Sequence, residues 1–139
     1  MAQLKVNDLD GLMLTMQEIA QIPDDVQAEI LNAQADIVVD AQKQSALAAG
    51  VSPHGEMMDS IGKTKIKTGN AGKSIYVYPQ GINSSGTRNA EVAFIREYGA
   101  KKRNQPGKMF IRNANEKSAE ATTKAAAEIY DAWLKTKGL

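Results

Sequence analysis

Residues 92–114 read VAFIREYGAKKRNQPGKMFIRNA, and this stretch organises the second half of the chain. Alternating apolar residues predict a strand over 90–95, with the valine and the phenylalanine on the core face. The triplet Glu-Tyr-Gly at 97–99 ends that strand, and a basic loop containing a proline follows. An aromatic turn at Phe110 then opens a long alanine-rich helix. We interpret this order as a framework that presents a basic loop, which favours assembly over catalysis.

The first half of the chain is predicted to be helical. Apolar residues at helical spacing predict a short helix over 1–22, with Asn7 or Asp8 as its N-cap. A long helix is predicted over 24–49, because apolar residues recur every three or four positions and Gly50 is a natural stop. Its predicted apolar stripe is Val26, Ile30, Ala33, Ile37 and Ala41, widened by Leu31 and Val38, with Gln27, Asp36, Asp40 and Lys43 outside it.

Three short strands are predicted next, over 61–68, 74–78 and 90–95. A tight turn at 70–72 joins the first two strands. A flexible loop at 80–89, with no packing residue except an isoleucine, joins the second strand to the third. These strands predict an antiparallel sheet with one face covered by helices.

Two further segments complete the domain. Residues 99–112 form the basic loop, and the last helix is predicted over 113–137. Its alanines allow close approach to a sheet or to another helix. We therefore predict a single α+β domain over 1–139, in which a small antiparallel sheet of three or four strands within 60–98 packs against the two long helices.

Composition limits the class of protein. The 139 residues include no cysteine, which excludes disulfides and thiolate metal sites and favours an intracellular origin. The chain begins with no signal-peptide pattern. No apolar run approaches the about 20 residues that a membrane-spanning helix needs, so we expect no membrane partner.

Charge is segregated along the chain. Residues 1–59 carry two basic and ten acidic side chains, a balance of −8, whereas residues 60–112 carry eleven basic and two acidic ones, a balance of +9. If the two segments lie on different surfaces, the molecule is bipolar and head-to-tail contacts are favoured. If the acidic helix packs beside the basic sheet, the charges are neutralised internally.

Catalytic chemistry has few candidates. His54, the one histidine, lies in a Pro-His-Gly turn and cannot build a zinc site alone. Asp36 and Asp40, one helical turn apart and near Glu29, could hold a metal ion or do acid–base work, but a solvated helix face explains them better. We therefore predict no catalytic, metal or cofactor-binding residue.

The basic residues form two groups that could meet an anionic partner. Alternation in a strand predicts that the lysines at 63, 65 and 67 project from one face together. The second group decorates the loop that follows the third strand. Each group is either a solvated surface or a contact for DNA phosphates or an acidic protein. The predicted docking or DNA-facing residues are Lys63, Lys65, Lys67, Lys101, Lys102, Arg103 and Lys108.

Several short motifs, taken in order, resemble a known family. They are a turn before a Ser-Ile strand, a strand ending in Glu-Tyr-Gly, and a proline followed by an aromatic turn into a helix with an early alanine. The family is that of the minor tail or tail-completion proteins of long-tailed bacteriophages, including head–tail joining or neck proteins of the lambda minor tail protein Z type. The residues that carry the resemblance are Gly55 within Pro53-His54-Gly55-Glu56-Met57, then Ser60, Glu97, Tyr98, Gly99, Pro106, Phe110 and Ala114.

The resemblance implies a non-enzymatic virion protein located at the tail or neck, and in the host cytoplasm before assembly. Copies would form a ring, six-fold in the family, against the connector or tail-tube proteins, with genomic DNA passing close by. The alternative is a small DNA-binding accessory protein that binds DNA regardless of sequence through the basic sheet. An enzyme that uses Asp36 and Asp40 is a third reading.

Overall fold

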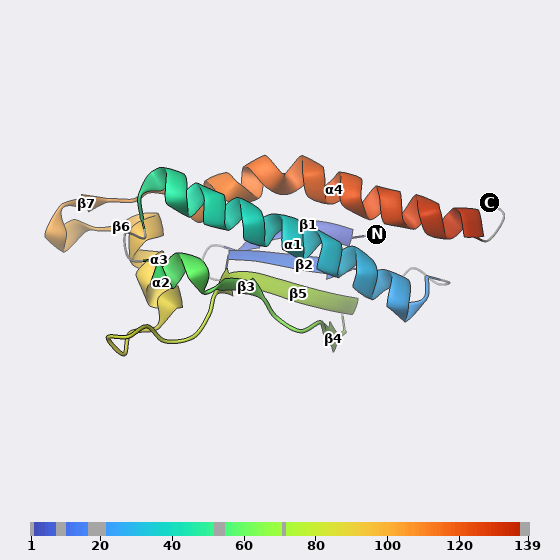
Figure 1. Ribbon diagram of the computed structural model, residues 1–139, viewed down its shortest axis with the longest axis horizontal. Helices are drawn as coiled ribbons and strands as arrows, with labels where there is room; N and C mark the ends of the chain where they lie inside the picture. Colours follow the sequence, from blue (N-terminus) through green and yellow to red (C-terminus); the bar gives the residue numbers. More distant parts are fainter. Residues whose placement is uncertain (1, 8–10, 17–21, 52–54, 71, 137–139) are drawn as a thin grey trace.

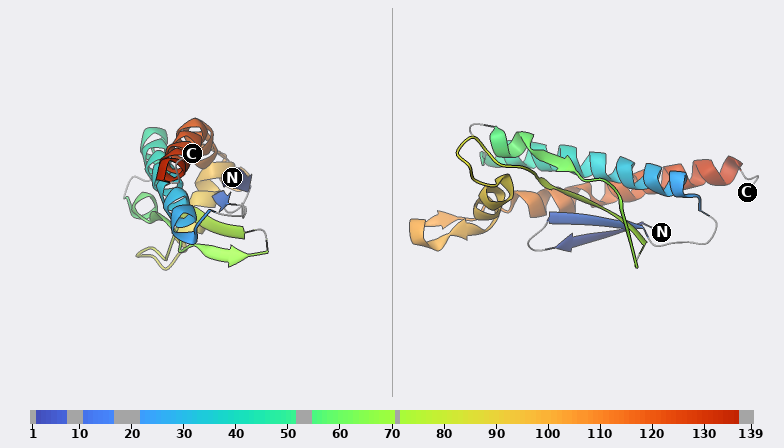
Figure 2. Two further views of the ribbon diagram at one scale, coloured as in Figure 1. Left: turned by 90° about the vertical axis from the view of Figure 1, so that its right-hand side faces the viewer. Right: turned by 90° about the horizontal axis from the view of Figure 1, so that it is seen from below.

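The computed structural model describes residues 2–7, 11–16, 22–51, 55–70 and 72–136. Two long helices pack side by side against a small antiparallel sheet, and a short hairpin projects from one end of the elongated molecule (Figure 1). The end-on view in Figure 2 shows the helices as one layer and the strands as the other. The predicted α+β class is confirmed.

The first long helix, α1, spans Asp24–Ala49, as predicted. Gly50 ends it with a φ of 65°, and its N–H donates to the carbonyls of Ala46 and Leu47. A residue in this left-handed conformation is a common helix stop, and glycine adopts it without a Cβ penalty. The local signals at both ends were therefore sufficient to locate this helix.

The buried face of α1 differs from the predicted stripe. Gln27, predicted to lie outside it, is buried, whereas Ala33, Ile37 and Ala41 are only half-buried. The helix contacts both the sheet and the second long helix, and it binds the latter through polar side chains that a search for apolar spacing overlooks. The buried residues of α1 are Gln27, Ile30, Leu31, Gln34, Ala35, Val38, Gln42 and Ala46.

The second long helix, α4, spans Phe110–Thr136 and begins three residues before the predicted start. It runs antiparallel to α1 (Figure 1). The amide of Gln42 donates to Asn115 Oδ1 at 3.1 Å inside the helix pair. Gln34 Nε2 likewise donates to the carbonyl of Thr122 at 3.1 Å. The two helices are thus joined by a buried polar seam as well as by apolar packing.

The sheet is built around β5, Gly72–Pro79. It pairs with β2, Gly11–Met16, on one edge, and with β3, Ile61–Lys63, and β4, Lys67–Gly69, on the other. The outermost strand is β1, Ala2–Asn7, which pairs with β2. Because β3 and β4 share one edge of β5, the sheet is four strands wide, and all its pairs are antiparallel.

β5 shows the alternating burial of a strand with one covered face. Ile75 and Val77 are fully buried against the helices, whereas Tyr76 and Tyr78 on the other face are half-buried. The strand predicted over 74–78 is confirmed within this longer one. The core cluster consists of Ile30, Leu31, Ala35, Val38, Ala46, Val51, Met57, Ile61, Ile75, Val77, Ala93 and Phe110.

Gly69 of β4 pairs with Gly72 of β5, as expected for the predicted turn at 70–72, within which Ala71 lies outside the described residues. The helix predicted over 1–22 is wrong, because β1 and β2 form a hairpin in which Asn7 pairs with Gly11. Asp8 and residues 17–21 lie outside the described residues, and so does Lys137 at the predicted end of the last helix.

The error at the N-terminus has a physical cause. Leu12 and Leu14 alternate with other residues, and they pair with Val77 and Ile75 of β5. A period-two pattern was therefore present within the same apolar segment that also fits helical spacing. Pairing with the edge of β5 supplies backbone hydrogen bonds that a local reading cannot anticipate.

The strand predicted over 90–95 is also wrong, because Asn89–Tyr98 forms the helix α3. Its buried residues are Asn89, Ala93 and Glu97, which recur every four positions. Phe94, predicted to face the core, is 45% exposed. Both edges of β5 already have neighbours, so the segment packs as a helix with its small and polar residues inward.

Candidate docking surface at the hairpin end

The predicted basic loop forms a short hairpin. We call residues 99–106 the basic arm: it comprises β6, Gly99–Ala100, the turn of 3₁₀-helix Lys101–Arg103, and β7, Gln105–Pro106. Asn104 closes the turn with a φ of 50°. The arm extends from one end of the molecule, beyond the C-terminal end of α1 (Figures 1 and 2).

The tip of the arm presents cations to solvent. Lys101 and Lys102 are exposed, and so is Lys108 at the base. Within the described part of the chain, none of these three lysines forms an ion pair. Three predicted docking residues therefore lie together as unpaired charges, while the side chain of Arg103 is outside the described atoms.

The base of the arm is held by two glycines. Gly99 has a φ of 83°, and a Cβ on it would lie 2.7 Å from the nitrogen of Gly107. The Lys108 N–H donates to the carbonyl of Arg96 at 2.8 Å, and the Met109 N–H donates to that of Glu97 at 3.1 Å. Backbone therefore packs directly on backbone where the two ends of the arm cross.

Glu97 fastens this crossing to α4. Its carboxylate accepts hydrogen bonds from the N–H groups of Ile111 at 2.8 Å and Arg112 at 3.0 Å. These are unpaired donors of the first helical turn, which a local N-cap side chain usually satisfies. A negative charge at this helix end is also favoured by the helix dipole. Glu97 thus acts as a non-local cap, and the side chain is only 5% exposed.

The remaining motif residues of this region support the same junction. Phe110, at the start of α4, is fully buried, and its carbonyl accepts a 2.7 Å hydrogen bond from Ser45 Oγ on α1. Ala114, one turn later, is 1% exposed. Pro106 is exposed and pairs with Gly99 in the arm. The structure brings these motif residues together at the junction of the arm with α4.

The other motif surrounds a short helix, α2, Glu56–Asp59. Gly55 precedes it with a φ of 78°, and Ser60 ends it, with Oγ donating to the Met57 carbonyl at 2.6 Å. Pro53 and His54 lie outside the described residues. The motif thus forms a compact turn that leads into β3.

The loop at 80–89 is tied to this turn. The carboxylate of Glu56 accepts hydrogen bonds from both the N–H and the Oγ of Ser84, at 3.0 and 3.1 Å. Asn83 Oδ1 accepts from the N–H groups of Ser85 and Thr87. Ile82, the expected packing residue, is 67% exposed. The loop therefore has a hydrogen-bonded shape, and its predicted flexibility stays a prediction.

An apolar patch lies beside the arm on the outer side of α3. The rings of Phe94 and Tyr98 are 5.0 Å apart between centroids, and both side chains are more than 40% exposed. Ile95 is 40% exposed next to them. Exposed aromatic residues grouped in this way are typical of protein contact surfaces. Reading this segment as a strand hid the patch, because Phe94 was assigned to the core.

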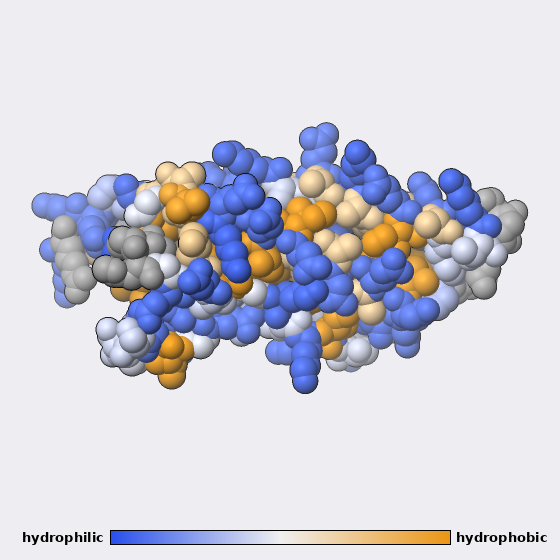
Figure 3. Space-filling model, viewed as in Figure 1, coloured by the Kyte–Doolittle hydropathy of each residue, from blue (hydrophilic) through white to orange (hydrophobic). Residues whose placement is uncertain are grey.

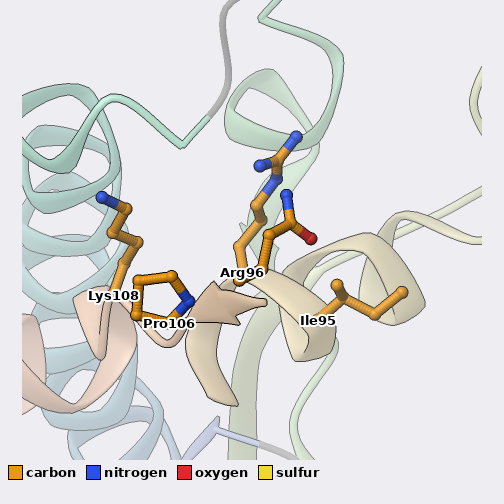
Figure 4. A pocket seen from close by; sticks show the side chains of 5 residues that line it. Ile95, Arg96, Pro106 and Lys108 are labelled. Carbon is orange, nitrogen blue, oxygen red and sulfur yellow. The ribbon is translucent and has the colours of Figure 1, made fainter. Parts of the chain in front are cut away.

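A shallow hollow of about 220 Å³ separates this patch from the arm. Figure 4 shows the ring of Pro106 between the side chains of Lys108 and Arg96, with Ile95 on the far side of Arg96. The hollow therefore has a mixed lining, in which the Pro106 ring lies between two cationic side chains. The residues that line the hollow are Ile95, Arg96, Gln105, Pro106 and Lys108.

The lysines of the sheet behave differently, because the predicted strand 61–68 is interrupted. Between Lys63 and Lys67 the strand advances four residues while β5 advances three, so one extra residue is inserted. The insertion is a β-bulge at Thr64, whose N–H donates to the Tyr76 carbonyl at 2.9 Å and whose Oγ1 accepts from the Tyr76 N–H at 3.1 Å. A one-residue shift reverses the face to which later side chains point.

The predicted common face of Lys63, Lys65 and Lys67 is therefore wrong. Lys63 points toward the helix layer, where its Nζ lies 2.8 Å from Asp36 Oδ1. Lys67 lies on the opposite face, with its Nζ 5.6 Å from the centroid of the Tyr76 ring. Lys65 and Lys67 are both exposed and form no ion pair with a described residue. Part of the acidic and basic charge is neutralised within the molecule, as the second reading of the charge pattern proposed.

The carboxylates of α1 do not gather into a site. Asp36 forms the ion pair with Lys63, and Asp40 accepts a hydrogen bond from Gln44 at 3.0 Å. Across the described residues, no three acidic or histidine side chains are grouped to hold a metal ion. No helix in the described ranges has the length and apolarity needed to cross a bilayer.

The chain shows no significant match to a model of a known protein family, to a curated protein or to a solved structure.

Proposed function

We propose that this chain is a non-enzymatic assembly protein of a phage particle, which acts in tail completion or head–tail joining as part of a ring, hexameric as the resemblance implies. The observation that supports this proposal is the construction of the basic arm. Its base is fastened by Glu97 and by the contact between Gly99 and Gly107, and its tip carries cations beside an apolar patch. Such an element serves to dock on another surface.

The energetics of docking favour this construction. Association costs conformational entropy wherever a flexible segment must become ordered. An arm whose two ends cross on glycine backbone and are capped onto a long helix loses less freedom when it binds. The unpaired lysines would steer an acidic surface toward it, and the apolar patch would supply buried area. Connector or tail-tube proteins and further copies of the chain are the proposed partners.

A DNA-binding accessory protein is the alternative, and the geometry gives it less support. Its proposed contact was a sheet face with three lysines in a row, but Lys63 and Lys67 lie on opposite faces and Lys63 is paired with Asp36. The arm could still meet DNA phosphates passively. This alternative predicts tight binding of arbitrary duplex DNA by the isolated protein, falling steeply as salt rises.

A genetic experiment tests the proposal. In the phage that encodes the chain, deletion of the coding region should leave heads and tails that do not join, visible by negative-stain electron microscopy. The wild-type chain supplied in trans should restore infectious particles. The double variant Lys101→Glu/Lys102→Glu should fold normally yet fail to restore them.

The matched control is Lys117→Glu/Lys124→Glu, which makes the same charge change on exposed positions of α4. It should complement like the wild type. Normal particles from the deletion phage would overturn the assembly function. Full complementation by the folded arm variant would instead remove the arm from the mechanism and leave the function standing.

A further inference from the structure

One face of α1 carries four acidic side chains, in two pairs that are two helical turns apart. Successive residues of an α-helix are turned by about 100°, so Asp25, Glu29, Asp36 and Asp40 fall within an arc of about 60°. All four are exposed, and Asp36 keeps 66% of its side chain exposed despite its ion pair with Lys63. We call these four residues the acidic stripe. Figure 3 shows the face on which α1 lies, where hydrophilic residues predominate and hydrophobic patches lie between them.

An exposed leucine continues the stripe. Leu47 falls within the same arc of the helix and is 71% exposed, the most exposed large apolar side chain among the described residues. It lies about 10 Å along the helix from Asp40, at 1.5 Å per residue. The surface of α1 therefore offers anions, then the half-buried Lys43 within the same arc, and then one exposed apolar side chain.

The basic arm presents complementary features in the same order: cations at its tip and a hollow at its base. Its tip bears Lys101 and Lys102, and the hollow at its base is lined by the apolar side chains of Pro106 and Ile95 among polar ones. The four residues from Pro106 back to Lys102 span at most about 14 Å of extended chain. The lysines therefore lie no more than about 14 Å from the hollow, a limit that includes the spacing of Asp40 and Leu47.

We propose that the basic arm of one copy docks on the acidic stripe of a second copy, with Leu47 entering the hollow and Lys101 and Lys102 facing Asp40 and Asp36. The inference rests on the proposed assembly function and names the partner of the arm. The contact is between molecules, because the arm extends away from α1 beyond its C-terminal end (Figure 2) while the stripe begins near the other end.

The two surfaces are different, so the contact is heterologous. A contact of this kind repeated by rotation closes into a ring when the angle allows, and otherwise propagates as a filament. Charge complementarity sets the direction of each contact, since arm against arm and stripe against stripe are both repulsive. Self-association should therefore weaken as ionic strength rises.

The test reverses the charge of the arm in one variant and the charge of the stripe in another. The arm variant Lys101→Glu/Lys102→Glu reverses the two lysines of the arm tip, and the stripe variant Asp36→Lys/Asp40→Lys reverses the two anions that face them. Each alone should associate at least about 10-fold more weakly than the wild type in sedimentation velocity and native mass spectrometry. An equimolar mixture should regain association, because each surface then meets its opposite on the other variant. Lys117→Glu/Lys124→Glu should associate like the wild type.

Cross-linking gives a second measurement that captures weak contacts. The chain has no cysteine, so single cysteines need no background substitutions. A mixture of Lys102→Cys and Asp40→Cys chains should form mixed disulfide dimers under mild oxidation, whereas Lys117→Cys with Asp40→Cys should form few.

Association that survives both reversals, a mixture that fails to recover it, or a wild type that does not associate together with Lys102→Cys and Asp40→Cys chains that do not cross-link would overturn this inference. Arm-dependent binding of duplex DNA without self-association would also overturn it and assign the arm to nucleic acid. These results test the partner of the arm, whereas the complementation experiment tests the assembly function. An incorrect partner can therefore be distinguished from an incorrect function.

Discussion

Gly99 and Gly107 pack backbone against backbone: a Cβ on Gly99 would lie 2.7 Å from the Gly107 nitrogen, and a Cβ on Gly107 would lie 2.8 Å from the Tyr98 carbonyl carbon. Real Cβ contacts are not this short, so neither position accepts a side chain without backbone movement. This contact explains why the arm leaves the molecule at a fixed place.

The contact predicts a large effect of a single methyl group. Gly99→Ala should lower the free energy of unfolding by at least about 2 kcal/mol, because it adds left-handed strain to a clash. Gly69→Ala is the control, since nothing lies within 4 Å of its Cβ position. Urea denaturation of both variants measures the difference. Equal stability of the two would contradict the crossing.

Glu97 should stabilise the start of α4 from a distance. Glu97→Ala leaves the N–H groups of Ile111 and Arg112 without their acceptor, and we expect a loss of about 2 kcal/mol. Amide hydrogen exchange should accelerate in the first turn of α4. Glu91→Ala, on the exposed side of α3, should change stability by less than about 0.5 kcal/mol. Unchanged exchange at Ile111 in the Glu97 variant would rule out the capping role.

The polar seam between the long helices should behave as a coupled pair. Asn115→Ala removes the acceptor of the buried Gln42 amide and should cost about 1–3 kcal/mol. Replacing both residues by leucine removes the unpaired groups together, so the double variant should be more stable than the sum of the single changes Gln42→Leu and Asn115→Leu predicts. Chemical denaturation of the two single variants and the double variant provides the cycle. Strict additivity would show that the two side chains act independently.

The β-bulge between β3 and β4 depends on the hydroxyl group of Thr64. Thr64→Val keeps the shape of the side chain but removes the acceptor for the Tyr76 N–H, so we expect a loss of about 1 kcal/mol. Thr68→Val, at an exposed position of β4, should be close to neutral or slightly favourable. Thermal unfolding compares the two variants. A Thr64 variant as stable as the Thr68 variant would mean that the backbone bond alone holds the bulge.

Local chain signals were sufficient for the long elements. Acidic residues after Pro23 and the stop at Gly50 bound α1 correctly, because caps and helix stops act within a few residues. The turn at 70–72 was predictable for the same reason. The start of α4 was placed three residues late, since its cap is Glu97, which lies 14 residues before Ile111, rather than a neighbouring side chain.

The same reasoning failed where a segment fits two periodicities. Leu12 and Leu14 suit both a strand and a helix, and Val92 and Phe94 alternate within what is a helix. In such cases the tertiary contacts decide the secondary structure. The N-terminal hairpin pairs with one edge of β5, and the helix α3 packs beside α2 and the arm. The apolar patch on α3 was missed as a direct consequence.

The amino-acid order by itself determined the α+β class, the two long helices, the central strand and the clustering of cations between residues 99 and 112, because these follow from patterns within a few helical turns. Tertiary structure alone decided which cations are free. Lys63 is neutralised by Asp36, and the bulge at Thr64 turns Lys67 to the other face, whereas Lys101 and Lys102 remain unpaired on the arm. Which ion pairs form, and to which face of the sheet a side chain points, depend on the contacts between elements that are distant in the sequence. No single segment of the sequence contains this information.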